Sequence, residues 1–176
     1  DRISEIQRRQ MTTEKASNVS VVSVDGNFDD CQSIVKSVFN DKDFSKTVSL
    51  TGVNSINWAR IISQVVYYLF AASRLPASAK IDFCVPTGNF GNIYAGYVAK
   101  KLGANIDKLI IATNRNDILH RTLSSGRYRK GEVLQTFSPS MDIQVSSNFE
   151  RMLYDVYHCN AKMVKKKMES LQLNGS

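Results

Sequence analysis

The sequence predicts an α/β domain built on a parallel sheet, and three observations support this class. Two short apolar runs, 81–85 and 108–112, enclose a helical stretch at 93–102. A strand, a helix and a strand within roughly 30 residues form a βαβ unit, whose crossover is right-handed. The 176 residues are 43% hydrophobic with a net charge of +7, so a sizeable core is available. Collagen-like, low-complexity and wholly disordered chains are excluded.

The first fifty residues predict two helices with a strand between them. Residues 1–16 place isoleucines on one face among charged neighbours, which favours a helix. Residues 18–24 are rich in valine and nearly alternate, which favours a strand. Asn27 is expected to cap the next helix, and the polar residues 40–53 to form a loop or short turns. The apolar stripe after Asn27 consists of Cys31, Ile34, Val35, Val38 and Phe39.

A long helix is predicted next. Asn54 or Ser55 is expected to cap it, and it should run to about Arg74, before the proline at position 76. Its apolar stretch, 61–72, is interrupted by Ser63 and Gln64 and is too short to span a bilayer. A helix that is apolar around most of its circumference is typical of the inside of a larger protein.

The second half of the chain predicts two further short helices. Asn116 and Asp117 should open the first, and residues 126–137 should form an exposed connection. Ser147 and Glu150 match the capping-box pattern, with Ser147 as the cap. The helix that they open carries Phe149, Met152, Leu153 and Val156.

Composition excludes several kinds of site. The cysteines and histidines lie too far apart for a disulfide framework or a metal site: Cys31, Cys84, Cys159, His120 and His158. This pattern indicates a reducing, cytoplasmic location without a metal. The start of the chain is too polar for a signal peptide, and no membrane segment is expected. Four lysines form a basic cluster that is best explained as a solvated helix end, not a nucleic-acid surface: Lys162, Lys165, Lys166 and Lys167.

The turn at 87–92, Thr-Gly-Asn-Phe-Gly-Asn, is the most informative stretch. It joins the end of a strand to the start of a helix, where backbone N–H groups without helical partners bind anions, above all phosphate. Gly88 and Gly91 lack a Cβ and can take positive φ, so the backbone could close around the oxygens. The P-loop and dinucleotide patterns are both absent. By spacing alone, a plain tight turn remains an equal alternative. Small residues should let the following helix pack closely on the sheet: Ala95, Gly96 and Ala99.

Four segments together resemble a known enzyme family. They are 53–60 (VNSINWAR), 85–93 (VPTGNFGNI), 112–119 (ATNRNDIL) and 138–151 (SPSMDIQVSSNFER). In this order they resemble threonine synthase, in the bacterial and fungal branch of that pyridoxal-phosphate enzyme. The resemblance covers residues 1 to about 157.

The resemblance implies the tryptophan-synthase-like fold, called fold type II, of which only the middle would be present. It implies conversion of O-phospho-L-homoserine and water to L-threonine and phosphate by a carbon–oxygen lyase acting on phosphates. Gly88, Asn89, Phe90 and Gly91 would hold the phosphate of pyridoxal 5'-phosphate. Residues 1–50 would end a smaller mobile domain, and 51–176 would belong to the large domain. The full-length enzyme would be a monomer or homodimer, with no nucleic-acid or membrane partner.

One departure from the family pattern is important. The Schiff-base lysine of the family lies in a Phe-Lys-Asp context, and no lysine here has that setting. The chain is therefore expected to be a central fragment without a catalytic residue of its own, and to be inactive alone. Two alternatives remain: a non-catalytic phosphate-binding α/β module, as a degenerate relative would be, and an inert excerpt.

Several polar residues have two interpretations each. Asn54, Ser55, Asn57 and Arg60 could bind a substrate phosphate, but capping and a structural ion pair of Arg60 are favoured. A second group could face the active cleft: Ser140, Asp142, Ser146, Ser147 and Asn148. Cys84 is expected to be an inert buried thiol.

Overall fold

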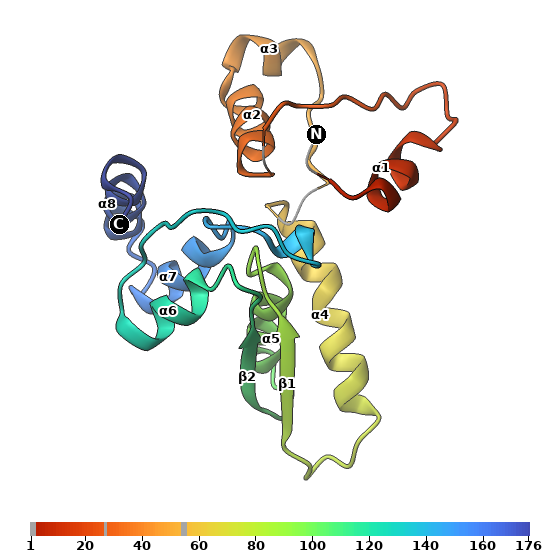
Figure 1. Cartoon of the computed structure of the whole chain (residues 1–176). Coiled ribbons are helices and arrows are strands. Elements are labelled where there is room, and N and C mark those ends of the chain that lie inside the picture. Colours follow the sequence, from red (N-terminus) through yellow and green to blue (C-terminus); the bar gives the residue numbers. More distant parts are fainter. Residues whose placement is uncertain (1–2, 27, 54–55) are drawn as a thin grey trace.

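The computed structural model describes residues 3–26, 28–53 and 56–176 (Figure 1). Helices dominate these residues, around one pair of strands. In chain order the elements are α1 (Glu5–Thr12), α2 (Phe28–Asn40), α3 (Lys42–Thr47), α4 (Trp58–Ser73), β1 (Ile81–Pro86), α5 (Gly91–Lys101), β2 (Ile106–Ala112), α6 (Ile118–Ser125), the 3-10 helix η1 (Pro139–Met141), α7 (Phe149–Val156) and α8 (Ala161–Asn174).

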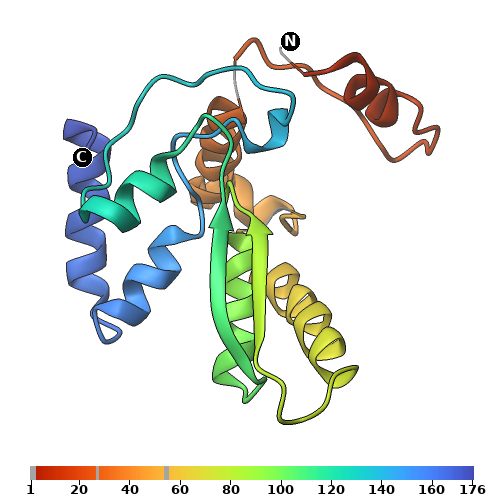
Figure 2. The ribbon, with the colours of Figure 1, turned by 60° about the horizontal axis from the view of Figure 1, so that its bottom comes forward.

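The βαβ unit confirms the predicted α/β class. Strands β1 and β2 pair in parallel, with Phe83 opposite Leu109 and Val85 opposite Ile111. Helix α5 connects them and lies behind the strands, with α4 beside it (Figure 2). Both strands end at the same edge of the sheet, so the turn that follows β1 and the loop that follows β2 meet there.

Close packing between α4 and α5 forms the centre of the core. A Cβ at Gly96 would lie only 2.7 Å from the ring of Tyr68 and 2.9 Å from Leu109, so the absence of a side chain sets the distance between the helices. Ala95 and Ala99 are fully buried on the same helix. The prediction that small residues keep α5 slim is confirmed.

Helices cover only one face of the sheet in the described part of the chain. Side chains along β1 alternate between exposed positions and positions that are buried or partly buried. Cys84 points to the open face and is exposed, so the prediction of a buried thiol was wrong. Helix α4 also leaves much of its apolar surface open, as its apolar circumference predicted: Ile62, Val66, Tyr67, Leu69 and Phe70 are exposed.

The N-terminal region differs from its predicted form in two places. Residues 18–24 form no strand, because no partner strand lies beside them within the described ranges; Val22 is 80% exposed. Residues 40–53 contain the short helix α3, which begins because the carboxylate of Asp41 accepts from the N–H groups of Asp43 and Phe44. Asn27, the predicted cap of α2, lies outside the described residues.

Two helix starts also need correction. Asn57, not Asn54 or Ser55, caps α4, and its Oδ1 accepts from the Ala59 N–H at 3.0 Å. Asn54 and Ser55 lie outside the described residues. Asn148, not Ser147, occupies the cap position of α7, so the predicted capping box was wrong.

The remaining surface features agree with expectation. Asp117 occupies the cap position of α6, and residues 126–137 form a largely exposed connection. The four lysines of α8 are exposed, as a solvated helix end should be. Within the described ranges, no helix combines the length and apolar character needed to cross a membrane.

Candidate anion-binding site

The turn between β1 and α5 forms one side of a hollow of about 570 Å³. The other sides come from the start of α4 and from the 3-10 helix η1. The hollow is lined by Val53, Arg60, Gln64, Pro86, Thr87, Gly88, Asn89, Phe90, Gly91, Asn92, Ser140 and Met141. The segments 53–60, 85–93 and 138–151, far apart in the sequence, therefore meet at one place.

Four successive backbone amides of the turn are open. Within the described part of the chain, no group accepts from the N–H of Gly88, Asn89, Phe90 or Gly91. The N–H of Thr87 is used, donating to the Ala112 carbonyl across the sheet at 2.8 Å. Four open donors at the N-terminus of an 11-residue helix, whose dipole is positive at that end, suit an anion.

Two carbonyls of the same turn accept hydrogen bonds from residues 146–148. Gly88 O accepts from Ser146 Oγ at 2.8 Å. Asn89 O accepts from both the backbone N–H and the side-chain Nδ2 of Asn148, at 3.1 and 3.0 Å. Because these carbonyls are held while the amides are open, the orientation of the peptide planes is fixed and the N–H groups stay available to a ligand.

The side chain of Asn89 adds a further support. Its Oδ1 accepts from Ser147 Oγ at 3.1 Å and from Gln32 Nε2 at 3.4 Å. Ser147 therefore holds the side chain of Asn89 in the turn and does not cap α7. Gln32 belongs to α2, so the N-terminal region touches the turn at this point.

Gly88 is required for steric reasons and not for its backbone conformation. Neither Gly88 nor Gly91 has positive φ, so that prediction was wrong; Phe90 is the left-handed residue, with φ 65°. The strain of this conformation is offset by packing, since the buried Phe90 ring meets Phe149 edge-to-face at 5.4 Å. A Cβ on Gly88 would lie 2.8 Å from Ile143 Cδ1. Gly88 is needed because the 138–144 segment passes so close.

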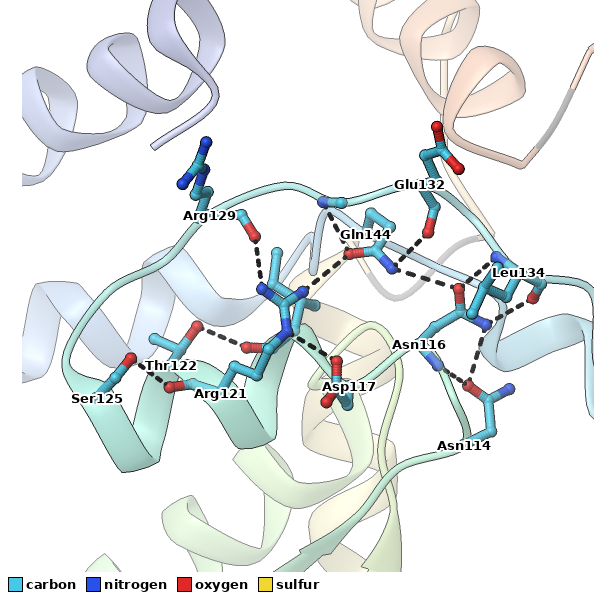
Figure 3. A network of polar contacts seen from close by, with 12 residues as sticks. Asn114, Asn116, Asp117, Arg121, Thr122, Ser125, Arg129, Glu132, Leu134 and Gln144 are labelled. Carbon is cyan, nitrogen blue, oxygen red and sulfur yellow. Dashed lines mark hydrogen bonds and ion pairs between the residues drawn. The ribbon is translucent and has the colours of Figure 1, made fainter.

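A polar network holds that segment in place (Figure 3). The side-chain amide of Asn116 pairs with the backbone of Leu134, as a neighbouring strand would. Its Oδ1 accepts from the Leu134 N–H and its Nδ2 donates to the Leu134 carbonyl, both at 2.8 Å. Gln144 reaches between the same elements, donating to the Glu132 carbonyl at 3.0 Å and accepting from Arg121 at 3.4 Å (Figure 3).

Asp142 is the second anchor of the segment. Its Oδ1 accepts from Thr136 Oγ1 at 2.6 Å and from Asn114 Nδ2 at 2.7 Å, and its Oδ2 accepts from the Thr136 N–H. The carboxylate is therefore occupied by these residues and does not line the hollow, contrary to one interpretation of the sequence.

Of the other predicted site residues, some line the hollow and some support the turn. Ser140 lines the hollow, whereas Ser146, Ser147 and Asn148 support the turn from behind. Arg60 lines the hollow and donates to the Val53 carbonyl at 2.7 Å; the expected ion pair is not found among the described residues.

Gln64 is a lining residue that the sequence interpretation did not select. Its Oε1 is buried without a partner in the described part of the chain. The available signal was a polar residue interrupting the apolar stretch of α4.

Comparison with known proteins shows which proteins share this sequence. No protein-family model matches the chain. Over 99% of its length it is 52% identical to threonine synthase of Pseudomonas aeruginosa, of which it covers 38%. Over 87% of its length it is 55% identical to threonine synthase of Saccharomyces cerevisiae, of which it covers 30%. The chain is homologous to part of threonine synthase.

Solved threonine synthases share the fold as well as the sequence. The pyridoxal-phosphate-bound enzyme of Brucella melitensis superposes with a TM-score of 0.85 and 57% identity, covering 99% of this chain and 38% of that one. The yeast threonine synthase gives a TM-score of 0.81 at 46% identity, covering 98% of this chain and 36% of that one. The resemblance carried by the four segments and the predicted α/β fold are confirmed. The chain spans 30–38% of the length of these relatives.

Proposed function

We propose that the complete protein of which this chain is part is a threonine synthase. It would convert O-phospho-L-homoserine and water to L-threonine and phosphate. The observation that carries the proposal is the set of four open amides at Gly88–Gly91, in a chain with such high identity to threonine synthases over nearly its whole length.

The turn fits the phosphate group of pyridoxal 5'-phosphate. Gly88, Asn89, Phe90 and Gly91 offer N–H donors and helix-dipole potential, and a Cβ at Gly88 would disturb the packing behind them. When bound, the cofactor supplies the electron sink for carbanion chemistry. The residues of this chain would hold its anionic end at a fixed point while Ser146 and Asn148 keep the amides oriented.

Several finer properties belong to the same proposal. The reaction is that of a carbon–oxygen lyase acting on phosphates. Three free cysteines suit a cytoplasmic protein, and the complete enzyme would be a monomer or homodimer. Residues 1–50 would end a small mobile domain, and 51–176 would form part of the large one. The contact of Gln32 with Asn89 would lie at the boundary between them.

The second candidate is a phosphate-binding module without catalysis. In the described ranges, no lysine lines the hollow. A degenerate relative that kept the turn and lost the Schiff-base lysine would have this arrangement. The two functions differ in turnover but share phosphate binding.

The test uses the complete protein. We expect saturable binding of pyridoxal phosphate, measured by absorbance, and release of inorganic phosphate from O-phospho-L-homoserine. Gly88→Val should weaken cofactor binding by about tenfold or more, because its side chain would meet Ile143 and Met141. Gly131→Val is the matched control, since a Cβ there meets only ordinary contacts at 3.5 Å and beyond.

Three outcomes separate the possibilities. Cofactor binding without phosphate release would favour the binding module. No binding of pyridoxal phosphate would exclude the threonine synthase. Equal cofactor affinity in Gly88→Val and wild type would remove the turn from the cofactor site.

A further inference from the structure

Arg151 connects two walls of the hollow without lining it. It lies in the first turn of α7 and reaches towards the segment before α4. Its Nη2 donates to the carbonyl of Ile56 at 2.7 Å, and its Nε donates to Asn148 Oδ1 at 3.0 Å. The guanidinium carbon also lies 5.4 Å from the centre of the Trp58 ring.

The partners of Arg151 indicate a geometric role. Both acceptors are neutral, and among the described residues no carboxylate lies within ion-pair distance of Arg151. A forked guanidinium can hold two acceptors at a fixed angle, which a lysine ammonium cannot do as rigidly. Arg151 therefore fixes Ile56 relative to Asn148.

Asn148 carries this connection on to the anion-binding turn. It is 0% exposed, and its Nδ2 donates to Asn89 O at 3.0 Å. The hydrogen bonds thus run without a break from Ile56 through Arg151 and Asn148 to Asn89.

The other end of the connection leads to Arg60. Ile56 directly precedes Asn57, which caps α4, and Arg60 stands one turn later at the edge of the hollow. In the described part of the chain, Arg60 is the cation that lines the hollow. Its position relative to the open amides thus depends on how the start of α4 is held.

We propose that Arg151 is a positioning residue that holds the first turn of α4, and with it Arg60, in register with the anion-binding turn. This inference rests on the proposed function. Without Arg151 the turn keeps its own bonds from Ser146 and Asn148, whereas the segment before α4 loses the hydrogen bond at the Ile56 carbonyl. The effect should therefore fall on the anionic substrate more than on the cofactor.

The experiment compares Arg151→Gln and Arg151→Lys in the complete protein. Hydrogen bonds to charged groups contribute about 1.5–3 kcal/mol, so Arg151→Gln should raise KM for O-phospho-L-homoserine by about tenfold or more. Its kcat and its affinity for pyridoxal phosphate should change by less than about threefold, because these do not depend on the lost bonds. Arg151→Lys keeps one donor group, so it should recover part of the KM. Arg127→Gln is the control, since Arg127 is exposed and its side chain makes no hydrogen bond within the described ranges.

A second measurement needs neither cofactor nor turnover. Backbone hydrogen exchange in the cofactor-free protein should be faster in the first turn of α4 for Arg151→Gln than for wild type. Exchange in α6, which has no bond to Arg151, should be unchanged. If wild type fails to turn over phosphohomoserine, the proposed function falls, and hydrogen exchange still decides the role of Arg151.

Two results would overturn the inference. One is a lower melting temperature in Arg151→Gln with unchanged KM and unchanged exchange, which would show a purely structural contribution. The other applies if Arg151→Gln does not fold: wild-type KM and exchange in Arg151→Lys would then exclude the positioning role.

Discussion

The βαβ unit with α4 and the N-terminal region of the same chain have similar apolar patterns but different structures. The first buries a continuous core that includes Ile61, Val65 and Val85. In the second, α1 and α3 have no buried residue, and the apolar stripe of α2 is largely exposed. The apolar sequence pattern therefore does not explain the difference in burial. The difference lies in the neighbouring elements against which each region can pack.

The two valine-containing runs show this most clearly. Residues 18–24 and 81–85 both predicted strands, yet only the second is paired. A strand needs a neighbour to satisfy its N–H and C=O groups and to cover one face. Within the described residues only 81–85 has such a neighbour.

The largest expected effect comes from placing a charge in each run. Val85 is 8% exposed, so Val85→Asp buries an unpaired carboxylate and should destabilise the complete protein by about 3 kcal/mol or more. Val22→Asp, at an exposed position, should cost about 0.5 kcal/mol or less. Urea unfolding measures both. A similar cost at the two positions would break the comparison, because it would require residue 22 to be buried.

A smaller effect separates two neighbouring tyrosines of α4. Tyr68 is 7% exposed and donates to the Asn92 carbonyl at 2.7 Å, whereas Tyr67 is 73% exposed. Tyr68→Phe should cost about 1 kcal/mol and Tyr67→Phe almost nothing, measured by urea unfolding at pH 7. Equal costs would show that the α4–α5 contact does not depend on this hydrogen bond.

The same pair predicts a pH dependence. Burial raises the pKa of Tyr68 to about 12, above its ordinary value of 10.0. The folded protein then holds a proton that the unfolded chain releases, so this contribution is complete below pH 10 and is lost as the pH rises towards 12. The stability difference between wild type and Tyr68→Phe should therefore shrink over this interval. A constant difference would contradict the raised pKa.

The smallest effect concerns α1, which is held by local contacts. Hydrogen bonds from Arg8 and Arg9 lower the pKa of Glu5 from 4.5 to about 2. This local stabilisation is present above pH 4.5 and is lost as the pH falls towards 2. Carboxyl titration by NMR measures it. Arg8→Gln should return the Glu5 pKa towards 4.5 without changing the unfolding midpoint of the core.

Local signals predicted the fold where the contacts are close in sequence. The run 81–85, the turn at 87–92 and the apolar run at 108–112 defined the βαβ unit. The predicted helical stretch 93–102 corresponds closely to α5. The resemblance assigned the family and proposed the four cofactor residues, and the open amides of Gly88–Gly91 agree with that proposal.

Long-range contacts explain most of what could not be predicted. Ser147 has the sequence context of a helix cap, but Asn89, 58 residues away, accepts its hydroxyl. The steric reason for Gly88 lies in Ile143, and the partner of Arg151 is the carbonyl of Ile56, 95 residues earlier. A local sequence pattern cannot predict contacts between residues so far apart in the chain.

The parallel pair of strands also has a practical consequence for expression and purification. Within the described ranges each strand has a single neighbour, so the outer edges of β1 and β2 present unpaired backbone groups. Such edges recruit strands from other molecules, especially beside exposed apolar side chains. Produced without the remainder of its protein, this stretch should precipitate or form soluble aggregates, and refolding trials should begin at low concentration.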